Sequence, residues 1–192
     1  MSHTVAKLHE SSFSLYRSVL GDEAWARLAP EVRRLHGGSP RVAFGELSVR
    51  RGAGWWARML GAILRLPPAG RRPVSLEVVE EAGVEAWTRD FDGYLLASRQ
   101  SVKPRQGASP MLCERFGPLA LDFRLRACGG ALVFVHVASH LALGGLRLRL
   151  PRWLSPRVRA CASADEDDGV AICVCVDVPG VRPLLRYEGC LR

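Results

Sequence analysis

Apolar and polar residues alternate with a period of two through most of the chain after residue 74. The clearest example is "LALDFRLRA" (119–127), in which Leu121 and Phe123 point one way and Asp122 and Arg124 the other. Such alternation is typical of a β-strand with one buried side and one solvent-facing side. The chain is therefore expected to be dominated by antiparallel sheet.

Two strong hairpin signals, Ala82-Gly83 and Asp92-Gly93, divide the region from 74 to 102 into three predicted strands. Counting onward to the final "PLLRYEGCLR" gives about nine or ten strands. A twisted sheet with so many strands does not stay flat. We predict an α+β, mainly antiparallel β fold, either a strongly curled sheet or a partly closed β-barrel.

The residues before the first strand are predicted to be helical. "SSFSLYRSVLG" and "DEAWARLAPEVRRLHGG" have helical spacing of apolar residues and end in glycine. A first strand is expected over 41–50. A β-bulge is expected at Gly45, where the apolar residues switch from one face of the strand to the other. Residues 1–11 are expected to form a flexible N-terminus and residues 12–192 a single domain.

The net charge of +8 raises the question of a nucleic-acid partner. Only Lys7 and Lys103 are lysines, so nearly all positive charge is arginine, spread along the chain and often on the solvent side of a strand. The sequence contains no recognisable nucleic-acid-binding module. We therefore expect no nucleic-acid partner.

The N-terminal "MSHTVAKLHESS" lacks the apolar centre of a signal peptide, and no apolar run approaches the roughly 20 residues of a spanning helix. We expect a cytoplasmic protein, in which the six cysteines, none in a C-x-x-C pair, stay reduced. His136 and His140 fall in a strand pattern, about 13 Å apart. With no cofactor motif present either, we expect neither a metal nor a cofactor.

Five segments follow one another in a recognisable order: "LYRSVLGDEAWARLAPEV", "WTRDFDG", "ERFGPLALDFRL", "LRLRLPRWLSPRV" and "VDVPGVRPLLRYEG". Together, from about Tyr16 to Leu191, they resemble the bacterial family known as domain of unknown function 4166. The resemblance implies a stand-alone protein of this size, or a relative of domains appended to saccharopine-dehydrogenase-like reductases. It implies no activity.

The segment "WTRDF" places Trp87, Arg89 and Phe91 on one face of a strand. If that face is concave, an arginine lies between two aromatic side chains. A buried arginine needs a carboxylate or a bound anion. Arg89 then either pairs within the core, with Glu114 or Glu188, or binds the acidic head group of an apolar ligand; on the opposite face it would be solvated.

Three more residues complete the predicted ligand-binding set. Tyr187 and Glu188 point to opposite faces of the last strand, so only one of them can line a cavity. Trp153, just after the strand "GGLRLRL", either lies at the mouth of a cavity or caps the core. In that strand Leu146 and Leu148 are expected to face the core.

The segment "WWARMLGAILRLPP" (55–68) predicts a short and almost wholly apolar helix ended by two prolines. One interpretation is a helix buried against the sheet. The alternative is a lid over a cavity, or a surface that contacts a membrane or a partner protein, through Trp55, Trp56, Met59 and Ile63.

Three functions remain open at this point. The first is a non-catalytic binding module for an apolar or amphipathic small molecule, such as a lipid or acyl compound. The second is an accessory, substrate-holding domain for a reductase partner, as the resemblance suggests. The third is an enzyme with an unrecognised acid/base pair. We expect no catalytic residue, since no nucleophile or acid/base motif is present.

Overall fold

The structure, a computed structural model, describes residues 14–143 and 146–192, so the predicted flexible segment 1–11 lies outside the described residues. The helices are α1 (Leu15–Leu20), α2 (Asp22–Ala26), α3 (Pro30–His36) and α4 (Trp55–Ile63). The strands are β1 (Arg41–Arg51), β2 (Gly70–Glu81), β3 (Val84–Phe91), β4 (Tyr94–Lys103), β5 (Met111–Phe116), β6 (Leu119–Cys128), β7 (Ala131–Leu143), β8 (Leu146–Arg149), β9 (Arg157–Ala164), β10 (Val170–Val178) and β11 (Val181–Leu191).

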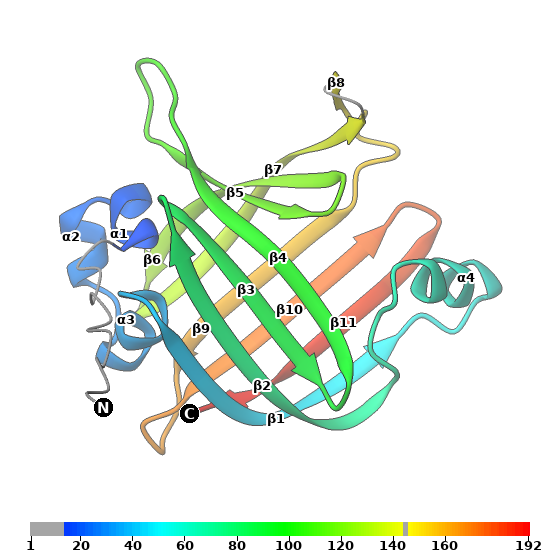
Figure 1. The fold of residues 1–192 in the computed structure, drawn as a ribbon, viewed down its shortest axis with the longest axis horizontal. Helices are drawn as coiled ribbons and strands as arrows, with labels where there is room; N and C mark the ends of the chain where they lie inside the picture. Colours follow the sequence, from blue (N-terminus) through cyan, green and yellow to red (C-terminus); the bar gives the residue numbers. More distant parts are fainter. Residues whose placement is uncertain (1–13, 144–145) are drawn as a thin grey trace, which may run out of the picture.

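The strands form one antiparallel sheet that closes into a barrel (Figure 1). Strands β1 to β7 follow one another around the ring, and β9, β10 and β11 return to β1. The pairing of β6 with β7 completes the closure, while β8 pairs with β7 beyond the end of β9. The predicted mainly antiparallel, barrel-like fold is therefore confirmed, with full closure in place of partial closure.

Tight hairpin turns join the strands of the first half of the barrel. At Ala82-Gly83 the φ angles are 51° and 77°, and at Asp92-Gly93 they are 56° and 90°. Positive φ at both central residues is the requirement of the type I′ turn, whose twist matches that of the strands. These turns lie where the sequence predicted them, and they set the register of β2, β3 and β4.

Helices α1 to α3 cover one end of the barrel (Figure 1). Their apolar faces are part of the core, with Leu15, Tyr16 and Val32 fully buried. The amide of Ala29, just before α3, donates to the carbonyl of Gly130 in the β6–β7 turn over 2.9 Å. The helices thus form a fixed closure of that end, which we call the floor end.

Strand β1 contains no bulge at Gly45, contrary to the prediction. Its pairing with β2 and β11 is continuous through this residue. A side chain is absent for a different reason: a Cβ on Gly45 would lie 1.9 Å from the carbonyl oxygen of Cys190 on β11. In the sequence the apolar residues switch faces because Val42 and Phe44, although apolar, are exposed on the outer wall.

Strand β8 also differs from the prediction. Leu146 and Leu148 are not buried in the core but are 59% and 48% exposed. They lie opposite Leu143 and Leu141 of β7, and Leu141 lines the barrel interior. Their apolar face therefore continues the inner wall beyond the ring of the barrel, where no further strand packs on it among the described residues.

Helix α4 lies at the end of the barrel opposite α1 to α3 (Figure 1). Only Ala57 and Gly61 of this helix are buried, whereas Trp55, Trp56 and Ile63 are exposed. The interpretation as a helix buried against the sheet is therefore wrong for most of its surface. No helix in the described part of the chain has both the length and the apolar character needed to cross a bilayer.

Candidate functional site

The inside of the barrel contains a cavity of about 480 Å³. Small-molecule sites in proteins typically measure about 300–1,000 Å³. The lining is mostly leucine, valine and phenylalanine, and among the described residues its charged members are Arg89 and Glu114. The cavity is thus large enough for a small organic molecule and apolar over most of its wall.

The part of the cavity away from α1 to α3 is apolar and forms its mouth. Its lining comes from α4 and the loop after it, from the β5–β6 turn and from the segment between β8 and β9. These side chains are Leu60, Leu64, Phe116, Pro118, Leu150 and Leu154. Two of them, Leu64 and Leu154, are also half exposed to solvent. The apolar lining therefore continues without interruption to the outer surface.

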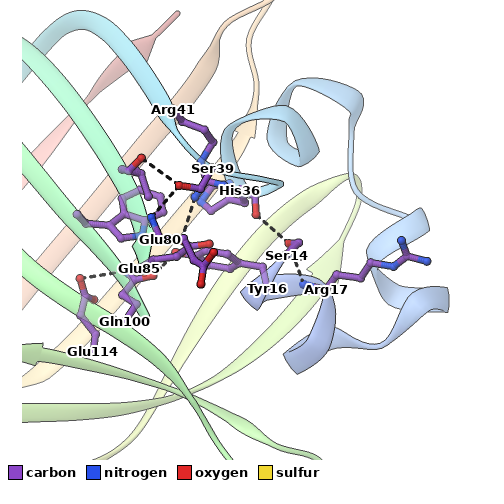
Figure 2. A network of polar contacts seen from close by, with 12 residues as sticks. Ser14, Tyr16, Arg17, His36, Ser39, Arg41, Glu80, Glu85, Gln100 and Glu114 are labelled. Carbon is purple, nitrogen blue, oxygen red and sulfur yellow. Dashed lines mark hydrogen bonds and ion pairs between the residues drawn. The ribbon is translucent and has the colours of Figure 1, made fainter. Parts of the chain in front are cut away.

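Polar side chains gather at the floor of the cavity, beneath α1 (Figure 2). The hydroxyl of Tyr16 donates to Oε1 of Gln100, and Nε2 of Gln100 donates to Oε1 of Glu114 over 3.1 Å. The same carboxylate oxygen accepts a bond of 2.7 Å from Oγ of Ser98 and lies 3.4 Å from Nη2 of Arg89. The charges of Arg89 and Glu114 consequently cancel within the protein.

A second buried ion pair lies next to this floor. Nη2 of Arg41 is 2.9 Å from Oε2 of Glu85, and Nε1 of Trp87 donates to the same oxygen over 2.8 Å. The guanidinium groups of Arg41 and Arg89 lie 5.7 and 5.2 Å from the centroid of the Trp87 ring. These distances are within the range of cation–π attraction. Trp87 thereby links the two ion pairs.

Burial changes the acid–base properties of the floor. It raises the pKa of Tyr16 well above its ordinary value, and the charges of Glu85 and Glu114 raise it further. Burial likewise raises the pKa of Tyr187 and that of Glu85, although Arg41 acts in the opposite direction on Glu85. The two phenols therefore remain protonated near neutral pH, and the hydroxyl of Tyr16 serves as a hydrogen-bond donor, not as a base.

The structure brings together most of the ligand-binding residues predicted from sequence. Trp87, Arg89 and Tyr187 line the cavity. Phe91 is fully buried beside them, with its ring centroid 5.4 Å from that of Tyr187. The pairing of Arg89 with Glu114, which the sequence left open against a bound anion, is the arrangement present.

The other two predicted ligand-binding residues lie elsewhere. Glu188 does not line this cavity, because it is on the outer wall of β11, where its carboxylate is 2.6 Å from Nη2 of Arg186. Tyr187 is thus the member of that pair that faces inward. Trp153 lies outside the barrel beside the mouth and is 70% exposed.

Sequence reasoning missed Tyr16 and Gln100 as parts of the floor. Tyr16 lies on a helix, and a strand pattern gives no information on which helical residue enters the barrel. The sequence did indicate Gln100, because Ser98 and Gln100 lie on the same face of the strand as Leu96, which faces the cavity. Polar residues at inward positions of a strand indicate a polar patch inside a barrel.

His36 of α3 also lines the cavity and is buried against Tyr16, with ring centroids 4.6 Å apart. Burial lowers the pKa of His36 to about 4, and Arg41 and Arg89 lower it as well, while a 2.9 Å contact of Nδ1 with the carbonyl of Val32 acts in the opposite direction. In the unfolded chain the pKa returns to about 6.5. The unfolded state therefore binds the proton first as the pH falls.

We expect the free energy of unfolding to decrease by about 2–3 kcal/mol between pH 7 and pH 4.5 because of His36 alone. His36→Phe removes the titrating group and should show a shallower decrease, since all carboxyl groups titrate alike in both proteins. Urea unfolding at both pH values measures the difference. Equal pH dependence in the two proteins would mean that His36 is not the buried neutral group described here.

No cluster of three or more His, Cys, Asp or Glu side chains suited to a metal ion occurs in residues 14–143 and 146–192. His136 contacts Phe123 of the inner wall, and His140 contacts Asp122. Asp122 lies opposite Cys113 in the pairing of β5 with β6, on the outer face of the sheet and away from the cavity. The side chains that line the barrel interior thus offer hydrogen bonding at the floor and apolar contact elsewhere.

Comparison with known proteins assigns the chain to a family. The family model described as "Domain of unknown function (DUF4166)" matches residues 28–191, which include every strand of the barrel. No curated protein and no solved structure matches the chain. The match covers most of the chain and agrees with the resemblance in the five sequence segments, so the protein belongs to the DUF4166 family.

Proposed function

We propose that this domain binds an apolar or amphipathic small molecule, such as a lipid or acyl compound, inside the barrel without converting it chemically. The observation that carries the proposal is the cavity of about 480 Å³, apolar from its mouth to its polar floor. A molecule with an apolar tail and a polar head matches this arrangement when the head points toward α1. Burial of the tail supplies most of the affinity.

The floor favours an uncharged polar head group over the acidic one suggested by the sequence. An anionic head group would have to separate Arg89 from Glu114, leaving a buried carboxylate without its partner. A hydroxyl or amide can instead accept from Arg89 or Tyr187 and donate to Glu114 with the ion pair intact. We therefore infer an alcohol or amide as the head group.

The test begins with native mass spectrometry of the protein purified without detergent, followed by solvent extraction. We expect a molecule bound one per chain, or, if the protein is empty, saturable binding of fluorescent phenylnaphthylamine. Dodecanol should displace that dye at lower concentration than dodecanoate, since the two differ only in the head group. An empty protein that shows no saturable dye binding would contradict the proposal, and a preference for dodecanoate would contradict the neutral head group.

A further inference from the structure

We infer that the open end of the barrel docks onto bilayers that contain anionic phospholipid. The surface concerned, here called the rim, consists of residues 52–69, which include α4, and residues 146–156, which include β8. Both segments contribute to the mouth of one cavity, so they surround the same opening. The inference rests on the side chains that the rim exposes and holds whether or not the cavity is occupied.

The rim exposes an unusual number of large apolar side chains. They are Trp55, Trp56, Met59, Ile63, Leu64, Leu146, Leu148, Trp153 and Leu154. Among them Trp55 is 61% exposed, Ile63 68% and Trp153 70%. Large apolar side chains exposed together around one opening indicate an interaction site, because their contact with water is unfavourable.

Helix α4 has the form of an interfacial helix. Its inward face is small, with Ala57 and Gly61 buried against the barrel. Its outward face carries two tryptophans stacked on each other, with ring centroids 3.7 Å apart, and Ile63. Tryptophan prefers the boundary between lipid head groups and acyl chains, where its ring is in apolar surroundings and its N–H reaches polar groups.

The charge of the rim identifies the kind of surface that fits it. Residues 52–69 and 146–156 contain the arginines Arg58, Arg65, Arg147, Arg149 and Arg152 and no aspartate or glutamate. Arg147 is drawn toward Asp122 on the outer wall at 3.9 Å, but Arg58, Arg65 and Arg152 are exposed beside the apolar side chains. Apolar side chains surrounded by cations without anions are complementary to an anionic bilayer, whose head groups carry phosphate.

The rim is also continuous with the inside of the barrel. Leu64 and Leu154 are exposed on the rim and line the cavity. A molecule leaving the cavity would therefore enter the acyl region of a docked bilayer without crossing water. This continuity favours a bilayer over a protein partner, because a protein covering the rim would close the mouth.

Sedimentation with lipid vesicles at low ionic strength tests the inference. The full chain should bind vesicles of phosphatidylcholine mixed with phosphatidylglycerol, and bind pure phosphatidylcholine at least about tenfold more weakly. The triple variant W55S/W56S/W153S should lose about tenfold or more in affinity, since it removes the interfacial tryptophans. The matched control is Phe44→Ser on the outer wall of β1, which is 62% exposed and should bind like the parent.

The arginines need a separate variant. R58Q/R65Q/R152Q should lose the preference for phosphatidylglycerol, whereas Arg126→Gln, exposed on β6 toward the floor end, should keep it. All substituted side chains are exposed, and circular dichroism verifies that each variant is folded. Absence of binding to anionic vesicles, or equal losses in W55S/W56S/W153S and Phe44→Ser, would overturn the inference. Concentration-dependent dimers that the same triple variant abolishes, without vesicle binding, would instead assign the rim to a protein interface.

Discussion

Replacing Glu85 by alanine should lower the free energy of unfolding by about 3–5 kcal/mol. The carboxylate of Glu85 is almost fully buried and is the partner of both Arg41 and the indole N–H of Trp87. Nε and Nη1 of Arg41 already have no hydrogen-bond partner among the described residues. Without Glu85 the guanidinium would be left buried and uncompensated. Urea unfolding at pH 7, followed by tryptophan fluorescence, measures the loss.

Two variants show whether the loss comes from the unpaired charge. Glu23→Ala removes the partner of Arg27 in an exposed pair of the same 2.9 Å length, and should change stability by less than about 1 kcal/mol. The double variant R41M/E85M removes both charges and should recover most of the stability lost in Glu85→Ala. A Glu85→Ala protein no less stable than Glu23→Ala would show that the pair is not buried as described.

Replacing Ala160 by tryptophan should weaken the binding of an apolar ligand at least about tenfold, which corresponds to roughly 1.4 kcal/mol. Ala160 lies on β9 opposite Val174 and Phe134, and all three side chains line the cavity. An indole at this position would occupy the space that the ligand needs. Because it fills a cavity, it should leave the barrel folded.

Titration with phenylnaphthylamine measures the effect of Ala160→Trp. The control is Ala97→Trp on β4, where Ala97 is exposed and its neighbour Leu96 faces the cavity. This variant adds the same indole to the outer wall and should bind the dye like the parent protein. Equal dye binding by all three proteins would place the bound dye outside the barrel, on a surface such as the rim.

Local patterns predicted the elements of the fold because their causes are local. The alternation in β6 and the turns Ala82-Gly83 and Asp92-Gly93 depend on residues that are neighbours in sequence. Closure of the barrel depends on the pairing of β6 with β7 and of β1 with β11, which no local pattern records. Gly45 shows the same limit, since the atom that excludes a side chain there belongs to Cys190.

The candidate site was predictable only in part, for the same reason. A period of two places Trp87 and Arg89 on one face, and both are found together in the cavity. The cancellation of charge by Glu114 requires β4 and β5 to lie beside β3, and the entry of Tyr16 requires the packing of α1. The exposure of Leu146 and Leu148 likewise depends on where β9 begins, and the sequence of β8 does not show this.

The pairing of β1 with β11 has a consequence for the synthesis of the protein. The two strands are adjacent in the ring, yet nearly the whole barrel sequence separates them. A ribosome releases β1 early and β11 last, so the ring stays open until the final strand has emerged. During that interval β1 and β10 are unpaired sheet edges, which can associate with other chains. Closure of the ring is therefore the last step in folding this domain, and it is the step at which a chaperone would protect the newly made strands.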